Sequence, residues 1–210
     1  NRRREFSSKI VETVMKFGQL DRMIDLRDNV SDEHFLEGTG SIVFDHDARV
    51  AYAAVSPRTS ADVLNALCER IGYQSFLFHC MDAKGEPVYH TNVVMCMGAG
   101  TAIVFLERIA EKVALAKTLQ DSGRLLVEIT RAQMESFCGN MLLLRDREDN
   151  LKMILSDTAM NALREDQQGV IFGKAEPVVV SIPVIERVGG GGIRCMLAEL
   201  FIQNKQNGQR

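Results

Sequence analysis

The sequence predicts an α/β fold in which a strand–strand–helix–strand unit is repeated along the chain. Pairs of short apolar segments recur with a period of ~45 residues. Each pair is followed by a segment with helical periodicity, and then by one further apolar segment. A unit of this kind cannot bury its apolar strand faces alone, so neighbouring units must pack together in a propeller, a solenoid or a circular array.

The first complete unit begins with two strands, expected at residues 41–44 and 50–55 and joined by a polar turn. A helix with one apolar face follows. Ser60 is its expected N-cap, and Gly72 is expected to end it, because glycine adopts the left-handed conformation that closes many helices. Residues 73–78 then form the expected third strand.

The second unit repeats this order. Strands are expected at residues 92–97 and 101–106, on either side of a glycine-containing turn. A helix is expected at 110–119, ended by Gly123, and a strand at 125–129.

The third unit has expected strands at residues 140–144 and 151–155, separated by a polar turn. Ser156 is the expected N-cap of a helix that reaches residue 163, and residues 178–182 are the companion strand.

The two ends of the chain fit parts of further units. A helix at residues 5–17 and a strand at 23–26 would be the back half of an earlier unit, and residues 195–202 the front strand of a last one. We therefore expect residues 1–210 to form a single α/β domain of repeated units, incomplete at its N-terminus.

Composition excludes several classes of function. The net charge is −3 with no basic face, which argues against a nucleic-acid partner. No apolar run reaches ~18 residues, so neither a membrane partner nor a signal peptide is expected. The five cysteines show no CxxC spacing, which predicts reduced thiols in a cytoplasmic protein without metal or other cofactor.

Four consecutive glycines at positions 189–192 precede Cys195. Glycine allows backbone and ligand to approach closely, and the neighbouring Arg194 favours an ionised thiol. Cys195 is therefore a candidate nucleophile. A flexible turn that leads into a buried strand thiol explains the same residues equally well, and a phosphate-binding loop is disfavoured because no Lys-Ser or Lys-Thr follows.

The repeat places four residues at the openings of successive units: Glu37, His90, Asn140 and Cys195. Taken singly, Glu37 fits a solvated turn and His90 a strand edge. A carboxylate, an imidazole and a thiol at the same place in successive repeats would instead converge, as in a nucleophile, acid/base and orienting group. Cys138 is the only rival thiol, because the other three lie on apolar faces.

Four motifs carry a resemblance to a known superfamily: FLEGTGS at 35–41, AVSPRT at 54–59, YHTNV at 89–93 and GGGGIRCMLAE at 189–199. The chain resembles the guanidino-group-modifying enzymes of the pentein fold, an α/β propeller of five ββαβ blades. Arginine deiminase, dimethylarginine dimethylaminohydrolase and glycine amidinotransferase belong to this superfamily. The similarity is greatest to amidinotransferase-related proteins of the citrulline-utilisation type, and it implies that an N-terminal blade is lacking here.

The resemblance implies roles for individual residues. Cys195 falls on the nucleophile, His90 on the acid/base and Glu37 on the acid of the superfamily. Arg58 falls on an arginine that resembles a clamp for the substrate's α-carboxylate, a role that suits its planar fork. Asn92 stands where deiminases carry an acid; an amide can donate to the oxygen of a neutral ureido group, which favours citrulline-like substrates.

The expected function is hydrolysis of C–N bonds in a small guanidino or ureido amino acid of the arginine or citrulline class, through a covalent Cys195 intermediate. An amidinotransferase that passes the amidino group to an amine is the first alternative. A catalytically silent pentein-fold binding protein is the second, and a metal hydrolase is the least favoured. Self-association into a homo-oligomer stays open.

Overall fold

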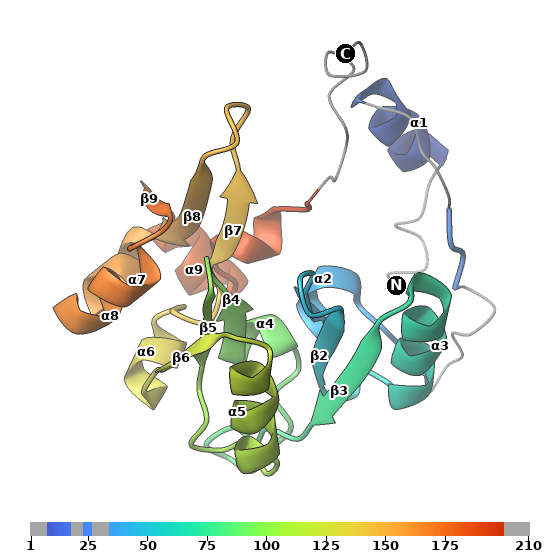
Figure 1. Ribbon diagram of the computed structural model, residues 1–210, viewed down its shortest axis with the longest axis horizontal. Coiled ribbons are helices and arrows are strands. Elements are labelled where there is room, and N and C mark those ends of the chain that lie inside the picture. The colour runs from blue at the N-terminus through green and yellow to red at the C-terminus, as the bar shows by residue number, and fades with distance from the viewer. Residues whose placement is uncertain (1–7, 18–22, 27–33, 200–210) are drawn as a thin grey trace. The chain divides into compact units, whose positions relative to one another are not determined.

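In the computed structural model the described residues are 8–17, 23–26 and 34–199 (Figure 1). They fall into a main unit, Leu26–Ala198, and a terminal unit, Asn1–Asp25 with Glu199–Arg210. In the terminal unit, helix α1 (Ser8–Phe17) lies within the expected helical segment, whose residues 5–7 are outside the described residues. The strand expected at 23–26 is wrong: these residues are irregular, because an apolar pattern makes a strand only where a partner takes up its backbone hydrogen bonds.

Within the main unit, the described residues contain three three-stranded sheets, each built from consecutive chain segments. The first consists of β1 (Val43–Asp45), β2 (Val50–Ala54) and β3 (Gln74–Phe78). The second consists of β4 (Met95–Met97), β5 (Thr101–Val104) and β6 (Leu125–Glu128). The third consists of β7 (Leu142–Arg145), β8 (Leu151–Ser156) and β9 (Glu176–Val180).

Helices connect the second strand of each sheet to the third: α3 (Ala61–Ile71), α5 (Lys112–Asp121), and the pair α7 (Asp157–Ala162) and α8 (Glu165–Ile171). Shorter helical segments precede or follow the sheets: α2 (Gly38–Ser41), α4 (Thr91–Val94), α6 (Arg131–Glu135), α9 (Pro183–Gly189) and a 3₁₀ helix at Ile193–Met196. No helix of the described residues has the length and apolar character needed to cross a bilayer.

All three sheets share one topology. The first two strands pair antiparallel as a hairpin, and the third pairs parallel with the second after a helical crossover. This is the predicted strand–strand–helix–strand unit, so the expected α/β fold of repeated ββαβ units is confirmed. The described sheets do not close into a full propeller.

The predicted helix signals act largely as expected. Gly72 follows α3 in the left-handed conformation, with φ of 71°. Ser156 caps α7 by accepting the Ala159 N–H at 3.2 Å. Ser60 occupies the N-cap position of α3, but its hydroxyl accepts the N–H of Phe35 at 2.9 Å. The cap residue therefore ties α3 to the chain segment that leads to Glu37.

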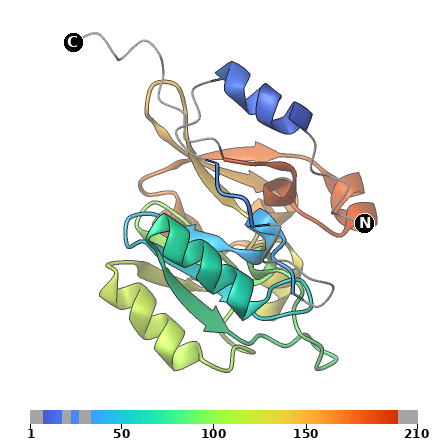
Figure 2. The same ribbon diagram turned by 90° about the vertical axis from the view of Figure 1, so that its right-hand side faces the viewer.

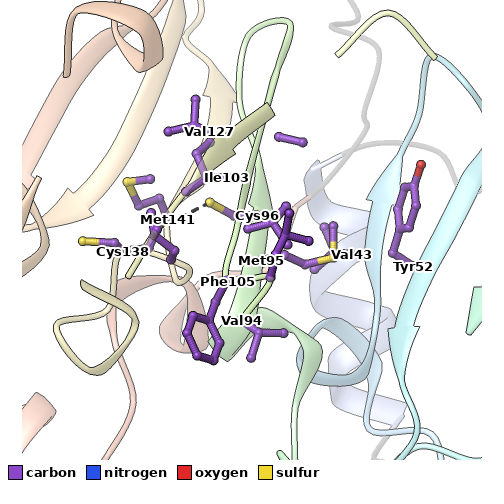
Figure 3. Close-up of a cluster of buried hydrophobic side chains, with 14 of the residues drawn as sticks. Val43, Tyr52, Val94, Met95, Cys96, Ile103, Phe105, Val127, Cys138 and Met141 are labelled. Carbon is purple, nitrogen blue, oxygen red and sulfur yellow. Dashed lines mark hydrogen bonds between the residues drawn. The ribbon is translucent and has the colours of Figure 1, made fainter. Parts of the chain in front are cut away.

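The apolar core of the main unit lies between the sheets. The strands β2 and β5 are buried along their whole length. The opening strands contact one another, β1 against β4 and β4 against β7. Figure 3 shows Val43, Met95, Ile103 and Met141, from different units, in one buried cluster. The helices α3 and α5 pack on β3 and β6 (Figure 2). Each unit thus buries its sheet against its neighbour, as the repeat requires.

Two of the differences from the expected boundaries lie near candidate site residues. The strand expected at 92–97 begins only at Met95, because residues 91–94 form the short helix α4. Cys195 lies in a 3₁₀ helix and not in a strand. No described strand pairs with this segment, and the Cys195 N–H donates locally to the Gly192 carbonyl oxygen at 3.2 Å. Residues 200–202 of that expected strand lie outside the described residues.

An ion pair joins the first unit to the second. Asp45, at the end of β1, has a fully buried side chain and accepts the Arg124 Nε–H at 2.7 Å. Arg124 also bonds Asp47, whose side chain is 86% exposed. Burial alone would raise the pKa of Asp45, but the hydrogen bonds and charge of Arg124 outweigh it, and the pKa lies below its ordinary value of 3.8.

We predict that Asp45→Asn lowers the free energy of unfolding by about 3 kcal/mol, because it leaves Arg124 without its buried partner. The wild-type contribution is present above the unfolded-state pKa of Asp45 and is lost as pH falls through the lower folded-state pKa. Urea unfolding at neutral and acidic pH measures both effects. Asp47→Asn is the matched control and costs about 0–1 kcal/mol; equal losses in the two variants contradict the prediction.

Candidate active site

Glu37 stands immediately before α2, at the opening of the first unit. Its backbone N–H donates to Ser41 Oγ at 2.9 Å and approaches the Arg58 carbonyl oxygen at 3.3 Å. The flanking residues Leu36 and Thr59 form a β-bridge. The segments that carry Glu37 and Arg58 therefore run side by side, and local backbone hydrogen bonds fix the position of the Glu37 backbone from which the carboxylate extends.

His90 stands in the same position before α4, at the opening of the second unit. Its Nε2 lies 2.8 Å from Oε2 of Glu37. The imidazole packs on Gly40, where a Cβ atom would lie 2.9 Å from the ring. The next residue, Thr91, is buried and donates to the carbonyl oxygen of Ser41. The His90 ring is therefore held between the Glu37 carboxylate and the backbone at Gly40, and its hydrogen bond to the carboxylate orients it.

Arg58 lies beside the same carboxylate. Its NH1 is 3.6 Å from Oε2 of Glu37, and its guanidinium lies over the ring of Tyr89 at 5.1 Å from the centroid. Ser56 links the two segments, since its Oγ accepts the Arg58 N–H at 3.1 Å and donates to the Tyr89 carbonyl oxygen at 2.9 Å. With 46% of its side chain exposed, Arg58 keeps donors that can reach a bound anion.

Cys195 presents an exposed thiol directly after the glycine run. Gly190 adopts φ of 66°, a conformation that favours glycine, and ends α9. A Cβ at Gly191 would lie 3.3 Å from the Cys195 Sγ, so the loop backbone passes close to the sulfur. The side chain of Arg194 is buried, and its NH1 donates to the Met141 carbonyl oxygen at 3.4 Å.

Two buried asparagines flank the sulfur. Nδ2 of Asn140 lies 3.4 Å from Sγ of Cys195, and Nδ2 of Asn92 lies 4.0 Å from it. Asn140 also donates to the backbone oxygen of Asn92 at 2.9 Å. The Oδ1 atom of Asn92 is buried without a hydrogen-bond partner among the described residues.

The segments that carry the predicted residues contact one another. The segment 89–92 touches the loop 190–195 at both of its ends, through Tyr89 Oη to the Gly190 carbonyl oxygen at 3.4 Å and through Asn92 to Cys195. His90 lies between these two contacts and bonds Glu37, which in turn approaches Arg58.

The other four thiols are buried, which bears on the choice of nucleophile. Burial raises the pKa of Cys68, and it raises the pKa of Cys80 and of Cys138 to about 12 and of Cys96 to about 11. The expected core role of Cys68, Cys80 and Cys96 is confirmed by their burial. Cys138 is equally buried, and its Sγ donates to the Ala159 carbonyl oxygen at 3.5 Å, so it does not compete with Cys195.

Sequence analysis gave no role to two residues of this site. Asn140 had a signal, because it opens the third unit as Glu37 and His90 open the first two. Its contact with the sulfur depends on how the third unit packs against residues 92–94, which no local pattern reveals. Tyr89 had no signal beyond its adjacency to His90, because its partners Arg58 and Gly190 are distant in sequence.

Known proteins share this fold. The N-terminal domain of ArgZ, an arginine dihydrolase from Cyanobacteria, solved bound to substrate, superposes with a TM-score of 0.59 at 16% identity, over 79% of this chain and 56% of that one. AgrE in complex with L-arginine gives 0.63 at 13% identity, over 80% and 23%. SxtG, an amidinotransferase from Microseira wollei, gives 0.56 at 13% identity, over 79% and 45%. The chain thus spans from about a quarter to just over half of these proteins.

The comparison with curated proteins found no match. The family model described as N,N dimethylarginine dimethylhydrolase, eukaryotic, matches residues 1–202 of the 210. This match and the shared fold confirm the superfamily indicated by the motifs. The chain therefore belongs to the eukaryotic N,N dimethylarginine dimethylhydrolase family, within the guanidino-modifying enzymes of the pentein fold.

Proposed function

We propose that the protein is a cysteine-dependent hydrolase that cleaves a C–N bond in the guanidino group of an arginine-like amino acid. The observation that carries the proposal is a contact between two segments: Tyr89 and Asn92, which flank His90 in sequence, bond the loop of Cys195, and His90 itself bonds Glu37. The family match and the arginine-binding structures of the same fold support this reaction class.

Cys195 is the proposed nucleophile. Its thiolate attacks the central guanidino carbon and forms a C–S bond. His90 then gives a proton to the departing nitrogen, and the C–N bond breaks to release an amine. Water next attacks the same carbon while His90 accepts its proton, and the C–S bond breaks. The products are the amine and a ureido amino acid, and the thiolate is restored.

Glu37 serves two partners through the same oxygen. Its Oε2 accepts from His90 at 2.8 Å and lies 3.6 Å from Arg58. The carboxylate therefore holds the imidazole in one orientation and stabilises it when it carries a proton. Only 18% of its side chain is exposed, so solvent screens this interaction less than at an open surface.

Asn92 bears on the choice between guanidino and ureido substrates. The ureido preference expected from the sequence assumes that the Asn92 amide N–H points toward the substrate and donates to the ureido oxygen. In the folded chain Nδ2 faces Cys195, and Oδ1 is the buried atom without a partner among the described residues. An acceptor in that place suits the N–H groups of a guanidinium, so we favour guanidino amino acids, including N-methylated arginine, over citrulline.

We predict that the purified protein releases ammonia from arginine, or dimethylamine from N,N-dimethylarginine, faster than it releases ammonia from citrulline, and that Cys195→Ser lowers kcat by about 10,000-fold. Assays of released amine and of ureido product measure both. Cys138→Ser is the control variant and keeps activity. A requirement for an added amine acceptor, with transfer of the amidino group to it, would assign an amidinotransferase instead, and absence of turnover would favour a silent binding protein.

We predict that Glu37→Gln lowers kcat by about 100-fold, because the amide holds the ring but does not stabilise its protonated form. Steady-state kinetics over a pH series measures this loss together with an acid shift of the limb assigned to His90. Glu111→Gln is the control, since Glu111 forms the same kind of pair with His79 away from Cys195. An unchanged pH profile in Glu37→Gln contradicts the proposed role.

We predict that Arg58→Gln raises KM for an α-amino-acid substrate about 10- to 100-fold, because a charged hydrogen bond to its carboxylate is lost. The matched comparison is the same guanidino compound without the carboxylate, whose KM stays within about twofold of the wild-type value on this reasoning. If both substrates weaken equally, Arg58 acts through Glu37 and not as a carboxylate clamp.

A further inference from the structure

We propose that Asn140 is a positioning residue that, together with Asn92, donates hydrogen bonds to the thiolate of Cys195 and fixes the sulfur for attack. This inference rests on the proposed function, in which Cys195 is the nucleophile. The effect of Asn140 on the thiol can be measured without any substrate turnover.

The donor count fits the geometry. A side-chain amide has two N–H groups. One N–H of Asn140 serves the backbone oxygen of Asn92 at 2.9 Å, and Nδ2 lies 3.4 Å from the Cys195 sulfur, within reach of the other. Asn92 adds a longer contact from its own Nδ2 at 4.0 Å. Oδ1 of Asn140 also lies 3.6 Å from the sulfur, where it accepts from the neutral thiol. The Nδ2 contact of Asn140 is the shorter one, and hydrogen bonds to the charged form of a group favour that form, so the two amide donors favour the thiolate.

The amide of Asn140 has little freedom to move. Only 3% of the residue is exposed. A Cβ at Gly192 would lie 2.7 Å from its Oδ1 and 3.1 Å from the ring of Phe137, so this glycine leaves just enough room for the amide. A fixed donor costs little reorganisation when charge develops on its partner.

The backbone before Asn140 is held in an unusual conformation. Phe137 has φ of 65°, a region that non-glycine residues seldom occupy, and its carbonyl oxygen accepts the Asn140 N–H at 2.8 Å. A Cβ at Gly139 would clash with the carbonyl oxygen of Val93. The turn is thus pressed against the segment that follows Asn92. Strain of this kind persists where the surroundings over-determine it, as they do around this amide.

The test measures the thiol pKa of Cys195 from the pH dependence of its alkylation by iodoacetamide, with the labelled peptide identified by mass spectrometry. Asn140→Asp keeps the size of the side chain and replaces both donors by a carboxylate. We expect the apparent thiol pKa to rise by at least about one unit, which makes labelling near neutral pH roughly tenfold slower. The buried thiols serve as internal references for folding, because they label only when the chain opens.

Gly192→Ala reaches the same amide without changing it. The added methyl group displaces Asn140 from the sulfur, so the thiol pKa is expected to rise in the same direction. Gly189→Ala is the matched control in the same glycine run: its Cβ would lie 3.9 Å from Ile185, an ordinary contact, and the wild-type pKa is expected. If Asn140→Asp does not fold, Gly192→Ala decides the question.

A wild-type thiol pKa in folded Asn140→Asp, or in Gly192→Ala where the first variant does not fold, would overturn the inference. The proposed function can fail separately. A protein without turnover whose thiol pKa still follows Asn140 retains the positioning role and loses the hydrolase assignment. If the protein turns over guanidino substrates but its thiol pKa does not depend on Asn140, the hydrolase assignment stands and the positioning role of Asn140 is lost.

Discussion

The site depends on one steric constraint: at the opening of successive units, a glycine leaves the space that a residue of another segment fills. Gly40 receives the ring of His90, Gly139 the backbone of Val93, and Gly192 the amide of Asn140. These contacts link the first unit to the second, the second to the third, and the third to the loop of Cys195. A methyl group at any of them would push apart the segments that carry the chemistry.

Hydrogen bonds complete what this close packing begins. The bond from His90 to Glu37 crosses the same boundary as the contact at Gly40, and the bonds of Asn140 cross the boundaries at Gly139 and Gly192. At the far end of β1, Asp45 and Arg124 also join the first unit to the second. The relative position of the units is therefore set by buried polar contacts as well as by apolar packing, and these contacts require specific geometry.

The sequence predicted most where the signals are local. Hairpins, crossover helices and the glycine that ends α3 follow from apolar spacing and turn residues, and the repeat singled out Glu37, His90 and Cys195 as candidates because each stands at the expected opening of a unit. The expectation was wrong where a neighbouring segment decides the structure: none of the described strands pairs with 23–26 or with Cys195, and residues 91–94 form a helix. The contact of Asn140 with sulfur also depends on packing between units.

For the proposed hydrolase, the amide at position 92 changes the charge beside the proposed nucleophile. A carboxylate in its place, with its nearest atom about as far from Sγ as Nδ2 is at 4.0 Å, would repel a thiolate until a cationic substrate lay between them. An amide carries no charge and turns its donor to the sulfur, so it does not repel a thiolate there. Its acceptor oxygen is left for the substrate's N–H groups. In the proposed reaction, one neutral side chain therefore interacts favourably with both the thiolate and the guanidinium, whereas a carboxylate would favour the guanidinium alone.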